Sequence, residues 1–205
     1  IYNLHRNYNI VHAAREQKIV RFITLGSSCS YSENVPLPNV ETQLWQGYPE
    51  NTYGICKLVL LEHLEKQNDF EWVYLIPPNI FGPGDHFGEK DAHFIPSTVK
   101  KLEDAVASNT DSIVAWGDGS QTRDFVYIDD LVYFLIEAFN NEKYNHCVLN
   151  ISTGIEISIK DIVSQIMECM GLLGRINVIW DITRPVGSKR KVCLLYTSPS
   201  PRDRT

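Results

Sequence analysis

Two spacings of hydrophobic residues alternate along the chain, and together they predict an α/β fold. Apolar residues recur at helical spacing over five stretches, which predicts helices at about residues 3–17, 51–67, 94–107, 129–140 and 158–171. Short apolar runs predict strands at 19–25, 71–77, 112–117, 124–128, 146–152 and 175–180. Helices that alternate with strands in this way are typical of a layered α/β architecture.

The composition narrows the class of protein without identifying its chemistry. The 205 residues are 43% hydrophobic and 21% charged, which is ordinary for a globular protein with a real core. A formal net charge of −6 argues against a nucleic-acid partner, because phosphate-binding surfaces need excess Lys and Arg. No apolar run approaches the roughly 20 residues of a membrane span. The five cysteines are scattered without zinc-ligand spacing, so we expect no metal site and a reducing, cytoplasmic location.

The stretch GSSCSY, residues 26–31, follows directly after a predicted strand. Open α/β sheets bind their ligands at the carboxyl ends of strands, so short polar side chains at this point are candidate site residues. Ser27 and Cys29 are two residues apart and would face the same side of a continuing strand. The alternative for Cys29 is a small core residue, the commonest fate of a free thiol.

A second candidate pair, Tyr53 and Lys57, is four residues apart on a predicted helix and therefore shares one helical face. A cation near the phenol favours phenolate, so this spacing predicts a lowered pKa for Tyr53 and a role in proton transfer. The chain holds ten tyrosines, and a chance match is the alternative interpretation.

Taken together, the two stretches resemble the extended short-chain dehydrogenase/reductase family, which includes the NAD-dependent epimerases and dehydratases. Ser27 and Tyr31 match its S-x-x-x-Y strand end, and Tyr53 and Lys57 match its Y-x-x-x-K helix. The resemblance continues through IPPNIFGPGDHF, WGDGSQTRDFVYIDDL and LNISTGIEISIKDI, and it covers nearly all of residues 1–192.

The resemblance implies a partial Rossmann fold, a doubly wound parallel sheet without its N-terminal half, joined to a small α/β substrate-binding domain. Residues 1–88 and 125–151 would form the nucleotide-binding part, and residues 89–124 and 152–192 the substrate-binding part. Residues 193–205, CLLYTSPSPRDRT, are rich in Pro, Ser and Arg, and we expect a non-native or disordered tail there.

By the same resemblance, Tyr53 would donate a proton to a 4-keto oxygen as hydride arrives from a nicotinamide. Lys57 would tune Tyr53 and hold the nicotinamide ribose, and Ser27 would bind the substrate oxygen. Pro78 and Asn79 match cofactor-binding positions. The expected cofactor is NADP in its reduced form, NADPH, with NAD as the alternative.

The thiol in GSSC and the His before IP are similar to one branch of the family, which epimerises C3 and C5 of a 4-keto sugar before reducing it. Cys29 and His93 would be the acid/base pair, since both groups titrate near neutrality. The implied substrate is a nucleotide-sugar, with a GDP-sugar as the leading choice. Four further residues match its binding positions: Lys101, Trp116, Arg123 and Lys191. The alternatives are a solvated helix charge for Lys101 and a core residue for Trp116.

The sequence departs from the family pattern in two ways. Ser27 to Tyr53 is about three residues shorter than expected, and no proline stands just before Tyr53. The glycine-rich loop G-x-x-G-x-x-G is absent, and GPGDHFG at 82–88 replaces one of its amides with Pro83. We therefore expect an N-terminally truncated fragment that is inactive by itself. The resemblance implies a homodimeric parent enzyme, since family members typically pair the helix at 3–17 and the Tyr53 helix across a two-fold axis. The alternatives are an NAD-dependent nucleotide-sugar 4-epimerase or dehydratase, and a non-catalytic binding module of the same fold.

Overall fold

The computed structural model describes residues 2–88 and 92–194 and divides the chain into two compact units. Unit 1 comprises residues 1–80, 125–154 and the C-terminal segment from Val192, and unit 2 comprises Phe81–Asp124 and Ile155–Lys191. Each unit is therefore assembled from segments that are distant in the sequence. No helix in the described ranges has both the length and the apolar character that crossing a membrane requires.

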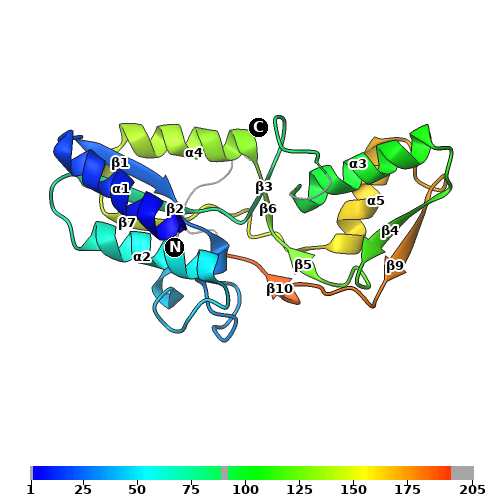
Figure 1. The fold of residues 1–205 in the computed structure, drawn as a ribbon, viewed down its shortest axis with the longest axis horizontal. Helices are drawn as coiled ribbons and strands as arrows, with labels where there is room; N and C mark the ends of the chain where they lie inside the picture. The colour runs from blue at the N-terminus through cyan, green and yellow to red at the C-terminus, as the bar shows by residue number, and fades with distance from the viewer. Residues whose placement is uncertain (1, 89–91, 195–205) are drawn as a thin grey trace. The chain divides into compact units, whose positions relative to one another are not determined.

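Unit 1 is built on a three-stranded parallel sheet with the order β1-β2-β7 (Figure 1). The strands are β1 (Arg21–Leu25), β2 (Glu71–Ile76) and β7 (Cys147–Asn150). Leu25 pairs with Leu75, and Ile76 pairs with Asn150, so the three strands end together at one edge of the sheet. This carboxyl edge positions the residues of the candidate site.

Helices cover both faces of this sheet, because alternate residues of β2 enter two different cores. Helices α1 (Tyr2–Glu16) and α2 (Thr52–Glu65) pack on Trp72, Tyr74 and Ile76. Helix α4 (Ile128–Asn140) packs on Val73 and Leu75 from the other face. Figure 1 shows α4 on one side of the strands and α2 on the other. A strand that is buried on both faces is typical of a doubly wound sheet.

Unit 2 contains a two-stranded parallel ribbon, β4 (Ser112–Trp116) and β9 (Asn177–Asp181), covered by α3 (Phe94–Ala107) and α5 (Ile159–Cys169). Three short strands, β10 (Arg190–Lys191), β5 (Thr122–Arg123) and β8 (Ile157–Ser158), form a second small sheet. Strand β3 (Asn79–Phe81) pairs with β6 (Phe125–Tyr127) where the chain passes from one unit to the other. Single 3-10 turns η1, η2 and η3 span Ser28–Ser30, Glu41–Gln43 and Glu142–Tyr144.

The α/β class is confirmed, and no end of a predicted helix or strand moves by more than about two residues. Two expectations were wrong. The chain does not continue as a strand through Ser27 and Cys29, because it turns into η1 after Ser27. The tail does not begin at Cys193: its side chain is 1% exposed, and the amide of Leu194 donates to the Asn39 carbonyl at 2.8 Å. The remaining tail residues, 195–205, lie outside the described residues.

Candidate active site

The candidate site begins where β1 ends, at a glycine that the packing requires. The amide of Gly26 donates to the carbonyl of Leu75 at 2.7 Å, which keeps this segment in register with β2. A Cβ at Gly26 would lie 2.3 Å from the Tyr74 ring, so a larger residue does not fit. Ser27 follows in extended conformation and caps η1, its hydroxyl accepting a hydrogen bond from the Cys29 amide at 3.1 Å.

Helix α2 carries Tyr53 and Lys57 to the same edge of the sheet. Asn51 caps the helix, because its side-chain oxygen accepts from the amide of Gly54 at 2.8 Å. Gly54 lies so close to η1 that a Cβ there would be 2.0 Å from the carbonyl oxygen of Cys29. The first turn of α2 is therefore pressed onto the turn that carries Ser27 and Cys29.

Tyr53 is 45% exposed, and its phenol interacts with the side chain of Ser27. Burial raises the pKa of Tyr53, the nearby Cys29 raises it further, and the hydrogen bond with Ser27 opposes the rise. The expectation that Lys57 lowers this pKa was wrong. The Lys57 ammonium lies 5.6 Å from the centre of the Tyr53 ring and donates instead to the carbonyl of Leu25 at 2.6 Å. A protonated phenol is the form that results.

Lys57 is itself partly buried between α2 and the end of β1. Burial lowers the pKa of Lys57, since the interior disfavours its charged form. Pro78 and Asn79 follow the carboxyl end of β2, and both are half-buried. Unit 1 thus brings Ser27, Cys29, Tyr53 and Lys57 together, with Pro78 and Asn79 after the neighbouring strand.

Tyr31, the last residue of the S-x-x-x-Y motif, has a different environment. Its side chain is 5% exposed, and its hydroxyl donates to the side-chain oxygen of Asn150 at 2.7 Å. Burial raises the pKa of Tyr31 most, and this direction matches a phenol that stays protonated in the core. Tyr31 therefore ties the loop after Ser27 to the end of β7.

His93 belongs to unit 2, whereas Cys29 belongs to unit 1. His93 immediately precedes α3, and its Nδ1 lies 3.1 Å from Oδ1 of Asp85. The imidazole is largely exposed while the Asp85 side chain is mostly buried. A carboxylate at one ring nitrogen fixes the orientation of the ring and leaves the other nitrogen for proton transfer.

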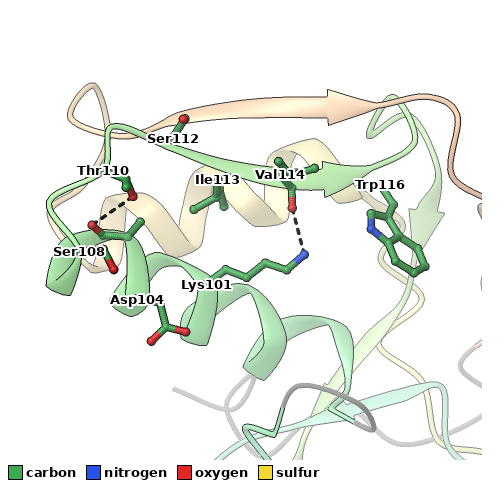
Figure 2. A pocket seen from close by; sticks show the side chains of 9 residues that line it. Lys101, Asp104, Ser108, Thr110, Ser112, Ile113, Val114 and Trp116 are labelled. Carbon is green, nitrogen blue, oxygen red and sulfur yellow. Dashed lines mark hydrogen bonds between the residues drawn. The ribbon is translucent and has the colours of Figure 1, made fainter.

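Lys101 and Trp116 line one hollow of unit 2, of about 360 Å³, between α3 and β4. Figure 2 shows Lys101 reaching from α3 to the carbonyl of Val114, a hydrogen bond of 3.0 Å. Trp116 is 54% exposed, and the guanidinium of Arg184 lies 5.6 Å from its ring centre. The core alternative for Trp116 does not describe this residue, since half of its surface is accessible.

Arg123 and Lys191 are paired residues on adjacent strands, β5 and β10 of unit 2. The guanidinium of Arg123 donates to the carbonyl of Thr122 at 2.7 Å. Beside them, Arg190 binds Glu156 through two hydrogen bonds of 2.7 and 2.6 Å, and this pairing lowers the pKa of Glu156 to about 2. Arg123 and Lys191 therefore lie on neighbouring strands of one small sheet, next to the ion pair of Arg190 with Glu156.

Sequence reasoning missed Tyr74, which contacts several of these segments. It is fully buried in β2, and its hydroxyl donates to the main-chain carbonyl of Lys57 at 2.8 Å. The signal was weak, since a tyrosine within an apolar strand is usually a packing residue.

Comparisons with known proteins find relatives over most of the chain. The chain is 30% identical to a GDP-L-fucose synthase from Escherichia coli, over 90% of the chain and 61% of that protein. It is 29% identical to GDP-L-fucose synthase 1 from Arabidopsis thaliana, over 93% of the chain and 60% of that protein. The chain therefore spans about three fifths of the length of these curated relatives.

Solved structures with the same fold include a GDP-L-fucose synthetase from Naegleria fowleri bound to NADP, with a TM-score of 0.81 and 22% identity over 94% of this chain and 60% of that one. A UDP-N-acetylglucosamine 4-epimerase from Methanobrevibacter ruminantium also has a TM-score of 0.81, with 22% identity over 98% of this chain and 64% of that one. The family model described as "NAD dependent epimerase/dehydratase family" matches residues 2–152. The resemblance that the motifs predicted is confirmed, and the chain belongs to the NAD dependent epimerase/dehydratase family.

Proposed function

We propose that this chain carries the catalytic residues of a GDP-L-fucose synthase. The reaction converts GDP-4-keto-6-deoxy-D-mannose to GDP-L-fucose by epimerisation at C3 and C5 and NADPH-dependent reduction at C4. The observation that carries the proposal is the cluster of Ser27, Cys29 and Tyr53 at the carboxyl edge of the sheet, with Lys57 one turn further along α2. The names of the relatives in E. coli and Arabidopsis support the choice of substrate.

In the reduction step, Tyr53 donates its phenolic proton to the C4 keto oxygen, and Ser27 donates a hydrogen bond to that oxygen. The raised pKa of Tyr53 keeps the phenol protonated at neutral pH, as a proton donor must be. Lys57, one turn further along α2, would hold the nicotinamide ribose beside the Tyr53 phenol.

The residues at this edge fit the nicotinamide half of a dinucleotide. Tyr53 and Lys57 are partly exposed and offer a phenol and an ammonium to ribose hydroxyls, at the edge where open α/β sheets bind such cofactors. Pro78 and Asn79 would line the same end. NADPH, when bound, supplies the hydride to C4, and NAD is the alternative. The chain spans about three fifths of its curated relatives, and its sequence shows no glycine-rich loop for the pyrophosphate, so the test below adds the N-terminal segment of a relative.

In the epimerisation step, Cys29 and His93 would remove and return the protons at C3 and C5. The thiol lies two residues after Ser27, and the imidazole is oriented by Asp85. Unit 2 would hold the nucleotide: Arg123 and Lys191 bind the diphosphate, while Lys101 and Trp116 contact the nucleoside. Units 1 and 2 would then serve as the nucleotide-cofactor and substrate domains.

The complete enzyme would act as a cytoplasmic homodimer. Apolar side chains are exposed on α1 and α2, where Tyr8 is 58%, Ile10 54%, Ile55 41% and Val59 42% exposed. Such a surface favours association between copies. Light scattering at micromolar concentration should give twice the monomer mass, and a monomer mass would contradict the dimer.

The decisive test is a chimera that joins the N-terminal segment of the E. coli relative to this chain. We expect the chimera to oxidise NADPH in the presence of GDP-4-keto-6-deoxy-D-mannose and to release GDP-L-fucose. The chain alone should bind no NADPH in calorimetry at micromolar concentration. A chimera that epimerises a UDP-sugar with NAD would be a 4-epimerase, and one that binds NADPH without turnover would be a binding module.

Cys29→Ser in the chimera separates the two steps. A serine hydroxyl fits the same space but is a far weaker acid and base than a thiol near neutrality. Exchange of solvent deuterium into C3 and C5 should fall by about 10²–10⁴-fold, while an already epimerised 4-keto sugar is still reduced. Unchanged exchange would make Cys29 a packing residue and remove the epimerase assignment.

A further inference from the structure

Tyr74, a buried residue of β2, contacts three separate segments of the candidate site. Its side chain is fully buried in β2, and its hydroxyl donates to the Lys57 carbonyl in α2 at 2.8 Å. Its ring lies against Gly26, where an added Cβ would be 2.3 Å from a ring carbon. Its phenol also interacts with the side chain of Ser30 in η1. One side chain thus joins the end of β1, η1 and α2.

Packing alone does not account for the hydroxyl. A phenylalanine would fill the space over Gly26 without burying a polar group, and it would remove a desolvation penalty. The carbonyl of Lys57 lies inside α2, where the helix itself supplies a hydrogen-bond donor four residues later. The hydroxyl therefore lies at a position where neither the core nor the helix requires it.

The three segments that Tyr74 joins are those that set the contact between Ser27 and Tyr53. Ser27 is the cap of η1, and Ser30 ends the same turn, from which its hydroxyl donates to the Gly54 carbonyl at 3.4 Å. Tyr53 and Gly54 belong to the first turn of α2. A movement of η1 away from α2 would separate Ser27 from the Tyr53 phenol.

We propose that Tyr74 is a positioning residue of the candidate site, which holds η1 against α2 so that the Ser27 hydroxyl stays on the Tyr53 phenol. The importance of that contact for catalysis rests on the proposed function, but the contact itself belongs to unit 1 and can be measured without turnover.

The titration of Tyr53 reports this contact. The groups that face Tyr53 are Ser27 and Cys29 at η1, Lys57 on its own helix and Tyr74 on β2. Ser27 lowers the pKa of Tyr53, so weakening that contact raises the pKa. A hydrogen bond of ordinary net strength corresponds to a shift of about half a unit to one unit.

The experiment follows the ¹³Cζ resonance of Tyr53 in the ¹³C-tyrosine-labelled chain as the pH is raised, with Tyr53→Phe as the assignment control. We expect Tyr74→Phe to move the onset of Tyr53 titration upward, in the same direction as Ser27→Ala. The double variant should match Ser27→Ala alone, since both changes remove one contact. Ser30→Ala removes the link from the other side and should act in the same direction.

Tyr144→Phe is the matched control, because Tyr144 is 8% exposed in the core on the opposite face of the sheet. It should leave the Tyr53 titration unchanged. The proposal is overturned if Tyr74→Phe and Ser30→Ala leave that titration unchanged, or if the effects of Tyr74→Phe and Ser27→Ala add. A shifted titration together with an inactive chimera would keep Tyr74 as a positioning residue and reject the proposed function.

Discussion

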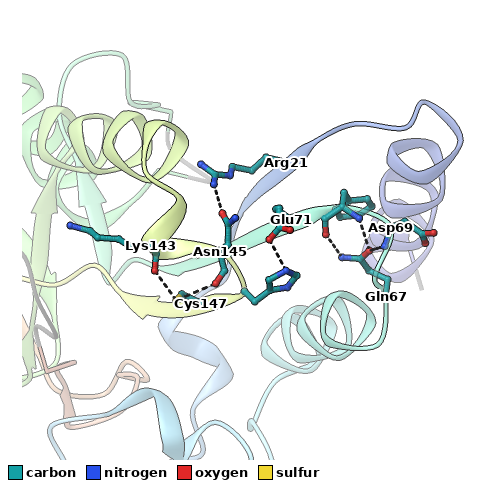
Figure 3. Close-up of polar contacts among 9 residues, drawn as sticks. Arg21, Gln67, Asp69, Glu71, Lys143, Asn145 and Cys147 are labelled. Atoms are coloured by element: carbon teal, nitrogen blue, oxygen red, sulfur yellow. Dashed lines mark hydrogen bonds and ion pairs between the residues drawn. The ribbon is translucent and has the colours of Figure 1, made fainter.

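Both ends of the β1-β2-β7 sheet carry polar side chains, but these side chains are held in different ways. At the amino end, charged groups bind one another: His146 lies 2.6 Å from Glu71, and Arg15 lies 2.5 Å from Asp69. Figure 3 shows Arg21 reaching the side chain of Asn145. Arg21 also donates to the carbonyl of Phe139 at the end of α4, at 2.5 Å. Such pairing neutralises charge and secures the ends of helices.

At the carboxyl end, the polar side chains are held mainly by main-chain groups. Lys57 donates to a carbonyl and Ser27 accepts from an amide. The pKa of Tyr53 is raised and that of Lys57 is lowered, in each case chiefly by burial. Partly exposed titratable groups whose pKa values are moved by burial are candidates for a functional site, whereas surface ion pairs are usually structural. The comparison therefore distinguishes the end of the sheet that carries the proposed site from an end held by ion pairs.

The largest expected effect lies at the carboxyl end. In the chimera, Tyr53→Phe removes the proton donor to the keto oxygen and should reduce NADPH consumption by about 10²–10⁴-fold. Deuterium exchange at C3 and C5 should persist, since Cys29 and His93 are intact. His146→Gln at the amino end is the control and should leave turnover at the parent level. A Tyr53→Phe chimera that consumes NADPH at the parent rate would show that Tyr53 is not the proton donor and that the carboxyl end has no special role.

Gly54→Ala tests how closely α2 approaches η1. In an ordinary helix interior, replacing Gly by Ala stabilises the folded protein by about 1 kcal/mol. Here the new Cβ would lie 2.0 Å from the carbonyl oxygen of Cys29. We expect a loss of about 1–3 kcal/mol in the free energy of unfolding, measured in urea. Ile55→Ala, at a 41% exposed position in the same helix, should change stability much less. A stabilised Gly54→Ala chain would contradict the close approach.

Arg21→Gln should remove the hydrogen bonds to the last carbonyls of α4, lowering the free energy of unfolding by about 1 kcal/mol. Arg15→Gln is a matched change at an exposed ion pair and should have a smaller effect. Neither variant should alter the Tyr53 titration. A shift of that titration in Arg21→Gln would mean that the two ends are not independent.

The smallest effect concerns the pH dependence of stability. Burial lowers the pKa of Lys57 from its ordinary value of 10.5, so between the two values the unfolded chain binds more protons than the folded chain. This group therefore contributes a rise of stability with pH that ends near 10.5. Lys57→Met should remove that rise in urea unfolding between pH 7 and 10. An unchanged slope would show that the ammonium is fully hydrated.

The sequence predicts the helices and longer strands of this chain well, because their apolar residues recur with a clear helical or strand spacing. Helix α3 is predicted at its observed ends, and its buried residues include Thr98, Leu102 and Ala105 at helical spacing. The two-residue strands β5, β8 and β10 were missed, because so short a segment has no period. Their pairing depends on tertiary structure alone.

The candidate residues were found by their spacing, but their environments were not. Four residues of separation on a helix places Lys57 near the Tyr53 ring, yet it does not reveal that the ammonium bonds to Leu25. The direction of the Tyr53 pKa depends on burial and on Cys29, which only the packing of α2 on η1 brings close. Tyr74 was missed for the same reason, since its contacts are with segments far away in the sequence.

Unit 2 is made of two insertions, residues 81–124 and 155–191, in the chain that forms unit 1. Its ribbon takes β4 from the first insertion and β9 from the second, and its core combines Leu102 and Ile113 with Val163 and Met167. Neither insertion can bury its apolar face without the other. If unit 2 is the substrate-binding part, as proposed, a transplant of substrate preference between relatives of this chain must exchange both insertions together, because exchanging one would leave a mismatched core.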